Sequence, residues 1–165
     1  MKIIVFRAKT FLIICLIIGV LLSTLYTPAV QSVFSASNGR SLPIYSVQTE
    51  EKKVAIGINC AWDDSDIPAM LSCLAEQKVN ATFFLLGEWA EKYPVSAATI
   101  AKSGQEIGSH SYSHRDLDSL SQSEILNEIS QSQQSIQKAC GQTPVLFRPP
   151  SGSYNDTVID CIHQS

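Results

Sequence analysis

From residue 54 onward the chain alternates between short apolar runs and amphipathic segments. Each apolar run is bounded by charged, glycine or polar residues, which is typical of a buried strand in a parallel sheet. We predict such strands at residues 54–58, 81–86 and 145–147, and a short strand at residues 106–109 between the last two. After the first strand, apolar residues recur at the spacing of one helical face. These residues are Ile67, Met70, Leu71 and Leu74.

The predicted helices carry recognisable signals at their ends. Asp66 is placed to cap the first helix, and Pro68 is tolerated in its first turn. A second helix around residues 97–101 ends at Gly104. Residues 121–124 have the form of a capping box, which predicts the start of a third helix.

A fourth helix at residues 156–163 completes four strand–helix units. This alternation predicts an α/β fold with a parallel sheet and helices outside it. An open sheet and a barrel both fit this order. In either architecture, functional side chains gather at the carboxyl ends of the strands.

The N-terminus begins with an apolar block at residues 11–26 that contains no charge. Basic residues precede the block, namely Lys2, Arg7 and Lys9. We predict that residues 1–30 form a hydrophobic helix that anchors the chain in the cell membrane. The alternative is a cleaved signal peptide, which would make the protein secreted. Both interpretations place the domain outside the cytoplasm, because the positive residues stay inside.

Residues 31–51 are rich in Ser and Gln and predict a linker, so residues 52–165 form the domain. The 165 residues carry 12 Lys and Arg against 15 Asp and Glu, a formal net charge of −3, and 45% are hydrophobic. This composition excludes a disordered chain. Without a basic excess to neutralise phosphates, it also argues against nucleic acid as a partner.

Polar clusters follow three of the predicted strands. His110 and His114 follow the third strand, and two histidines four residues apart share one face if the segment is helical. Neutral imidazoles suit zinc, and a third ligand would come from the first strand end. The candidates for that ligand are Asp63, Asp64 and Cys60. Arg148 precedes two prolines after the fourth strand, on a backbone that suits pairing with a carboxylate.

Four segments, taken together in this order, resemble the polysaccharide deacetylases of the NodB homology family, carbohydrate esterase family four. They are residues 53–56, 79–87, 104–114 and 147–152. The resemblance implies a distorted (β/α) barrel and a divalent metal, usually zinc. It also implies hydrolysis of the acetamide bond in N-acetylated cell-wall or spore-wall sugars, such as peptidoglycan. The leader and the tryptophan in the first motif are most similar to the spore-associated branch.

The same resemblance implies roles for individual residues. His110 and His114 match the metal-binding histidines, and Arg148 matches the arginine that orients the catalytic base. The residues matching the wall of the substrate groove are Pro149, Pro150, Ser151 and Gly152, with Trp62 as a further substrate contact.

The first motif departs from the family pattern Thr-Phe-Asp-Asp. Asn59 stands at the position of the base, and an amide does not accept a proton near neutral pH. Cys60 stands at the position of the metal ligand, and a thiolate can bind zinc. Asp63 and Asp64 follow closely and are candidate substitutes for the base. We expect one of these two acids, rather than Cys60, to lie nearer the histidine pair.

Residues 54–165 have room for about four strand–helix units, which is about half of a complete barrel. The sequence therefore predicts the front half of a deacetylase domain, from a truncated gene product or a fragment. Two functions stay open, a metal-dependent hydrolase and a non-catalytic relative that binds glycan or metal. An inactive remnant is a third interpretation.

Overall fold

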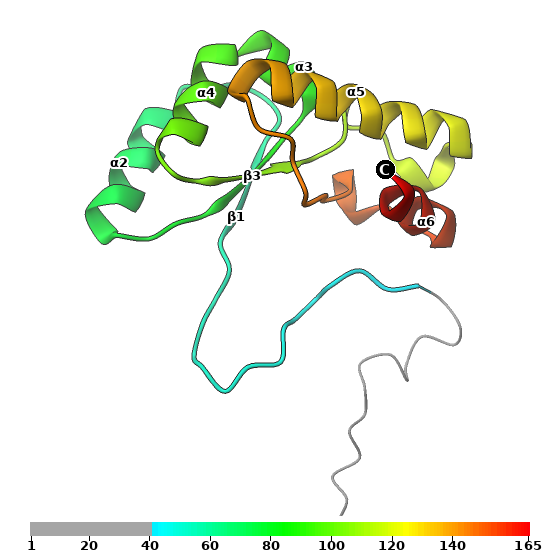
Figure 1. Ribbon diagram of the computed structural model, residues 1–165, viewed down its shortest axis with the longest axis horizontal. Helices are drawn as coiled ribbons and strands as arrows, with labels where there is room; N and C mark the ends of the chain where they lie inside the picture. The colour runs from blue at the N-terminus through cyan, green and yellow to red at the C-terminus, as the bar shows by residue number, and fades with distance from the viewer. Residues whose placement is uncertain (1–40) are drawn as a thin grey trace, which may run out of the picture. The chain divides into compact units, whose positions relative to one another are not determined.

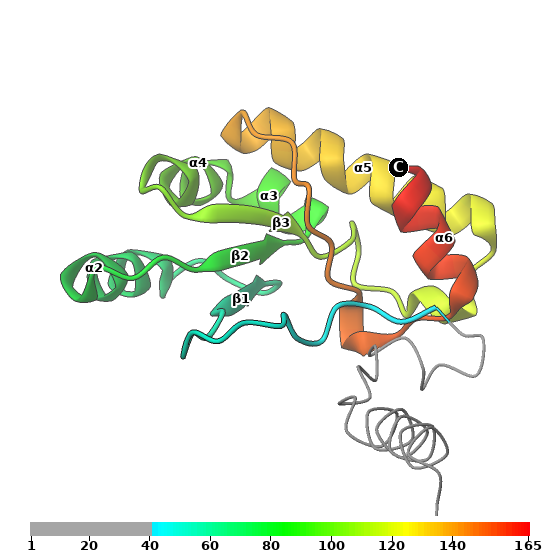
Figure 2. The same cartoon turned by 60° about the horizontal axis from the view of Figure 1, so that its bottom comes forward.

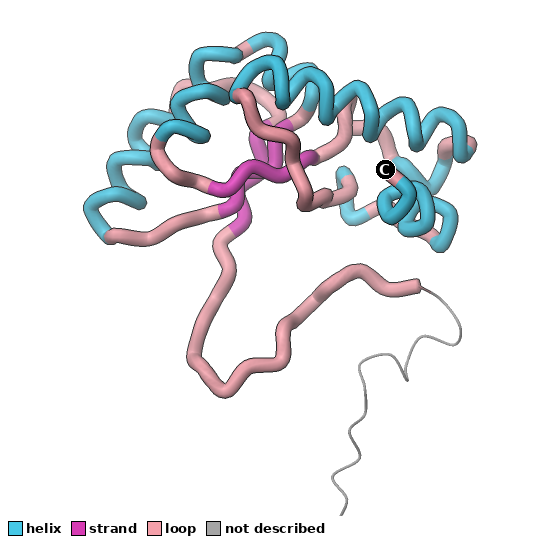
Figure 3. The backbone as a smooth tube through the Cα atoms, in the orientation of Figure 1, coloured by secondary structure: helices cyan, strands magenta, loops and turns pink. Residues whose placement is uncertain are grey.

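The computed structural model describes residues 41–165, which form a three-stranded parallel sheet with helices packed against it (Figure 1). The strands, in their order across the sheet, are β1 (Gly57–Cys60), β2 (Thr82–Leu85) and β3 (Glu106–Ser109). The helices are α2 (Ile67–Gln77), α3 (Gly87–Lys92), α4 (Pro94–Lys102), α5 (Gln122–Cys140) and α6 (Asp156–Gln164). Two short 3-10 turns are η2 (Leu117–Ser119) and η3 (Pro150–Gly152), and Figure 3 shows all helical segments in cyan. The predicted α/β fold with a parallel sheet is confirmed.

The register of the strands gives the sheet two different faces, because successive side chains point to opposite sides. One row of paired residues packs against the helices and consists of Ile58, Phe83 and Ile107. The neighbouring row lies on the opposite face and consists of Asn59, Phe84 and Gly108. The chemistry of the site is built on this second face.

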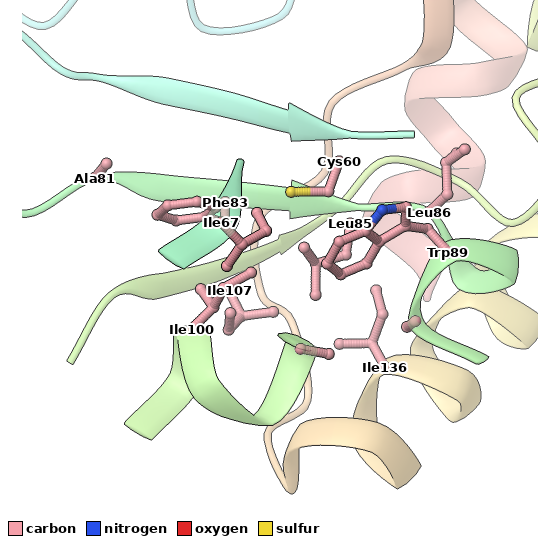
Figure 4. Packing of buried hydrophobic residues seen from close by; sticks show 12 residues of the cluster. Cys60, Ile67, Ala81, Phe83, Leu85, Leu86, Trp89, Ile100, Ile107 and Ile136 are labelled. Carbon is pink, nitrogen blue, oxygen red and sulfur yellow. The ribbon is translucent and has the colours of Figure 1, made fainter. Parts of the chain in front are cut away.

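The main hydrophobic core lies between the sheet and the helices. Phe83, Leu85 and Ile100 are fully buried in it, and Trp89 of α3 packs beside them (Figure 4). The indole nitrogen of Trp89 donates a hydrogen bond to the backbone oxygen of Asp63 at 3.1 Å. This bond satisfies the polar atom of a buried tryptophan and ties the loop after β1 to α3.

Helix α6 packs against α5 (Figure 2). A second hydrophobic cluster lies where the two helices meet. Its buried residues are Leu117, Ile125, Ile129, Val158 and Cys161. Ile136, nearer the end of α5, belongs to the main core instead. One long amphipathic helix therefore joins the two clusters and spans the side of the domain.

The helix ends agree in part with the sequence signals. Ser121 and Glu124 form the predicted capping box, with each side chain bonded to the other residue's backbone N–H. Pro68 lies in the first turn of α2 as expected, whereas Asp66 occupies the N-cap position without a side-chain cap bond. Helix α3, which the sequence pattern missed, begins directly after β2.

Two strand predictions need correction. The first strand begins at Gly57, and Val54 is 90% exposed, because β2 offers pairing partners only from Thr82. The fourth strand is reduced to a single bridge between Ser109 and Phe147. Prolines flank this segment at positions 144 and 149 and lack the N–H that a ladder requires.

The end of the predicted linker contacts the domain. The backbone N–H of Ser41 donates to Asp156 Oδ1 at 2.9 Å, and the hydroxyls of Tyr45 and Tyr154 lie 2.7 Å apart. The prediction of a hydrophobic helix at residues 1–30 falls outside the described residues. Within residues 41–165, no helix has the length and apolar character needed to cross a bilayer.

Candidate functional site

The two histidines lie at the carboxyl end of β3, beside the segment that bridges to it. His110 follows β3 directly and is 3% exposed. Its Nδ1 lies 2.7 Å from the backbone oxygen of Arg148, and a carbonyl only accepts, so Nδ1 carries the proton. The Nε2 lone pair of His110 is therefore free to bind a cation. The ring centres of His110 and His114 are 5.3 Å apart, and the rings are nearly perpendicular.

Burial sets the charge of His110. It lowers the pKa of the imidazole, and the nearby His114 and Arg148 lower it further, while the bond to the Arg148 carbonyl acts in the opposite direction. The net shift is downward, so His110 is neutral at physiological pH. Neutral imidazole is the form that binds a metal.

A loop, rather than a helix, brings the two histidines together. Residues 110–116 have no helical assignment, and both Ser111 (φ 73°) and His114 (φ 62°) adopt left-handed backbone conformations. The helical turn that would place residues i and i+4 on one face is therefore not the reason for their proximity.

Glu128 of α5 holds this loop, and the sequence analysis missed it. The side chain is 6% exposed and accepts hydrogen bonds from Ser111, Tyr112 and Ser113. Burial raises the pKa of its carboxyl, but these hydrogen bonds outweigh burial and the net shift is downward. Its position in the sequence was the available signal. Glu128 falls among the buried positions of α5, three residues after Ile125 and directly before Ile129.

Arg148 lies across the face of the sheet opposite the helices. Its Nη1 donates to Asn59 Oδ1 at 2.9 Å, and its guanidinium carbon lies 4.1 Å from the centre of the Phe84 ring. Gly57 provides the space, because a β-carbon there would overlap Nη2. The arginine is thus held by an amide and an aromatic face.

Cys60 points away from this group, into the main core. It is 4% exposed, and burial raises the pKa of its thiol to about 12. Figure 4 shows its sulfur among the core side chains. The physical reason is strand alternation, because Asn59 and Cys60 are consecutive and occupy opposite faces.

We expect Cys60 to resist alkylation in the folded protein. At pH 8 its thiol is almost entirely protonated, since the pKa is about 12, and the thiolate is the reactive form. Iodoacetamide should modify the exposed Cys73 at least about tenfold faster, as measured by mass spectrometry of the labelled peptides. Unfolding in urea should abolish the difference, and equal labelling in the native state would contradict this placement.

The two acids after β1 make other contacts. Asp63 Oδ1 accepts from Ser65, and Asp64 Oδ2 accepts from the hydroxyl of Ser96 on α4 at 2.5 Å. Across residues 41–165, no third His, Cys, Asp or Glu joins His110 and His114 in a group that could hold a metal ion. The structure therefore does not bring Asp63, Asp64 or Cys60 to the pair as a third ligand.

The remaining predicted residues are Trp62 and the segment 149–152. Trp62 is 80% exposed, and its ring centre lies 6.2 Å from that of His114. Pro150 is buried at the start of η3, while Ser151 and Gly152 are exposed and both have positive φ. An exposed indole therefore stands beside the histidine pair.

Comparison with protein families matches residues 46–165 to polysaccharide deacetylase. The chain belongs to the polysaccharide deacetylase family. It is 40% identical over 118 residues to the protein YlxY of Bacillus subtilis (strain 168), covering 72% of this chain and 37% of YlxY. It is 38% identical over 115 residues to the peptidoglycan-N-acetylmuramic acid deacetylase PdaC of the same organism, covering 67% of this chain and 24% of PdaC.

Solved structures of polysaccharide deacetylases share the fold. A CE4 family pseudoenzyme from Bacillus anthracis matches with a TM-score of 0.68 and 36% identity, over 70% of this chain and 41% of that one. A mutant of the pseudoenzyme has restored enzymatic activity. PdaC itself matches with a TM-score of 0.63 and 35% identity, over 69% of this chain and 56% of that one. The chain thus spans only part of the length of these relatives.

Deacetylases of this family depend in general on a metal. Two residues of this chain, His110 and His114, are suited to bind one. His110 offers a neutral imidazole whose second ring nitrogen is oriented by a carbonyl, as in many metal sites, and His114 offers a second imidazole beside it. A catalytic zinc site has three protein ligands, and the described residues supply two. The two imidazoles are therefore the side chains that would hold a divalent metal here.

Proposed function

We propose that this chain binds N-acetylated cell-wall glycan at the strand-end site and hydrolyses it poorly or not at all. The observation that carries the proposal is the hydrogen bond from Arg148 to Asn59. The family resemblance assigns that arginine to orienting the base, and its partner here is a neutral amide. An amide cannot take the proton of an attacking water near neutral pH.

The identity of the relatives supports peptidoglycan as the glycan. PdaC is a peptidoglycan-N-acetylmuramic acid deacetylase, and two relatives from Bacillus cereus are peptidoglycan-N-acetylglucosamine deacetylases. The exposed indole of Trp62 offers a flat apolar surface with a polar edge, which suits a sugar ring. The imidazole of His114, whose ring centre lies 6.2 Å from that of Trp62, offers a polar group beside it.

His110 and His114 would hold a divalent cation such as zinc. When bound, the cation supplies a Lewis acid that polarises a carbonyl oxygen, such as that of an acetamido group. Two contacts within the chain orient the side chains of this site. The backbone carbonyl of Arg148 fixes the His110 ring, and Asn59 fixes the Arg148 guanidinium.

Hydrolysis with Asp63 or Asp64 as the base is the second candidate function. The contacts of Asp63 with Ser65 and of Asp64 with Ser96 argue against it. Both carboxylates would have to leave these partners to reach a water at the histidine pair. Binding without turnover needs no such rearrangement.

Replacing Trp62 with alanine should weaken binding to purified peptidoglycan about tenfold, because roughly 1.4 kcal/mol of stacking is removed. Co-sedimentation of the full-length protein with insoluble peptidoglycan measures the affinity. Val95→Ala on α4 is the matched control, since Val95 is 78% exposed and also apolar. Equal binding by wild type and Trp62→Ala would contradict the proposed role of the indole, and no binding by wild type would contradict the proposed function.

A further inference from the structure

Glu128 contacts every residue between the two histidines. Its Oε2 accepts from the Ser111 hydroxyl at 2.7 Å, the Tyr112 N–H at 3.1 Å and the Ser113 N–H at 3.0 Å. Its Oε1 accepts from the Ser113 hydroxyl at 2.6 Å. One carboxylate on α5 therefore accepts four hydrogen bonds from this loop.

The buried charge of Glu128 has no cationic partner in the described part of the chain. The ion pairs there are Lys53–Glu51 and Arg115–Glu124. A buried carboxylate is costly unless it is hydrogen-bonded, so its energy depends on the loop keeping this conformation. The dependence is mutual, because the loop N–H groups would otherwise be unpaired near the core.

The backbone oxygens of the same loop are fixed from the other side. The N–H groups of Gly87 and Glu88, at the start of α3, donate to the oxygens of Ser111 and Tyr112 at 3.0 and 3.1 Å. Helix α3 thus holds the carbonyl side of the loop, and Glu128 holds the N–H side. Left-handed conformations at Ser111 and His114 are unfavourable for these residue types, so they need such support.

We propose that Glu128 is a positioning residue that sets the spacing of His110 and His114 for a shared divalent cation. This inference rests on the proposed function, in which His110 and His114 bind a divalent cation. The hydrogen bonds of Glu128 go to Ser111, Tyr112 and Ser113 and not to either imidazole, so it acts through the three residues between the histidines. Residues that orient metal ligands in this way typically change metal affinity by about 10–100-fold when they are replaced.

Zinc affinity of the full-length protein, measured by competition with a chromophoric chelator, tests the inference. Glu128→Ala should lower the affinity of the histidine-dependent site about 10–100-fold. Glu128→Gln should recover most of it, because the amide oxygen can replace Oε2 and the Ser113 hydroxyl can accept from the amide nitrogen. A His110→Ala/His114→Ala variant lacks both imidazoles, so any zinc that it binds is held elsewhere, for example by cysteines. That background is subtracted from the zinc bound by each of the other variants.

Ile129→Ala is the matched control for stability. Ile129 neighbours Glu128 on α5 and packs in the second hydrophobic cluster. This variant should lower the melting temperature and leave zinc affinity unchanged. If Glu128→Ala does not fold, Ser113→Ala removes one of the four hydrogen bonds and should lower the affinity by a smaller factor.

The two proposals fail in different ways. Histidine-dependent zinc binding that Glu128→Ala leaves unchanged would overturn the positioning role alone. Zinc binding that does not depend on the histidines would overturn the cation site. In that case, NMR contacts between the ring protons of His110 and His114 still test Glu128. They should be present in wild type, Glu128→Gln and Ile129→Ala and lost in Glu128→Ala, and their persistence in Glu128→Ala would overturn the inference.

Discussion

The full-length protein, supplied with zinc and an N-acetylglucosamine oligomer, is expected to release acetate at least about 10²–10⁴ times more slowly than PdaC. This factor is the usual contribution of a general base. Asn59 occupies the place beside Arg148 where the family resemblance puts the base, and its amide oxygen only accepts a hydrogen bond there. Enzyme-coupled detection of acetate measures the rate.

PdaC, assayed in the same buffer, serves as the positive control. The zinc content of both proteins should be measured, so that a slow rate is not caused by missing metal. Turnover close to that of PdaC would contradict the prediction. It would show that another carboxylate acts as base, and Asp63→Asn and Asp64→Asn would then separate the two candidates.

Replacing Asn59 with aspartate is expected to raise acetate release by at least about 10²-fold, the lower end of a general base's contribution. Asn59 is exposed at the surface of the sheet, so a carboxylate there remains partly solvated. Arg148 Nη1 lies 2.9 Å from the side-chain oxygen and would pair with the new charge. A mutant of the pseudoenzyme relative has restored enzymatic activity.

Asn80→Asp is the matched control for this gain. Asn80 is also exposed, and it precedes β2, at the end of the sheet away from the histidines. The Asn80→Asp substitution introduces the same charge and should leave the rate of acetate release unchanged. A rate for Asn59→Asp no higher than that of wild type would show that the base is not the missing element. The incomplete ligand set of the cation site would then be the limiting feature.

Several features of the fold follow from the sequence because they depend on local interactions. The capping box at Ser121 and Glu124 is one, since both partners lie within a single helical turn. The buried runs that became β2 and β3 are another. The apolar residues of β2 favour burial, and the alternation of strands with helices favours parallel pairing of both strands.

The boundaries and partners of the outer strands could not be predicted in this way. Val54 has the composition of a strand residue, yet it is exposed because β2 begins further along the pairing register. The fourth run forms one bridge, since its flanking prolines lack the N–H of a ladder. In both cases the outcome depends on a partner segment remote in the sequence.

The sequence by itself determined the family, the parallel α/β order and the gathering of Asn59, His110 and Arg148 at one end of the sheet. These depend on residue type, spacing and the shared direction of parallel strands. Only the tertiary structure decided that Asn59 meets Arg148 while Cys60 enters the core, because a residue's face depends on strand register. It also decided that Glu128 holds the histidine loop, since that contact joins segments that are distant in the chain and share no sequence period.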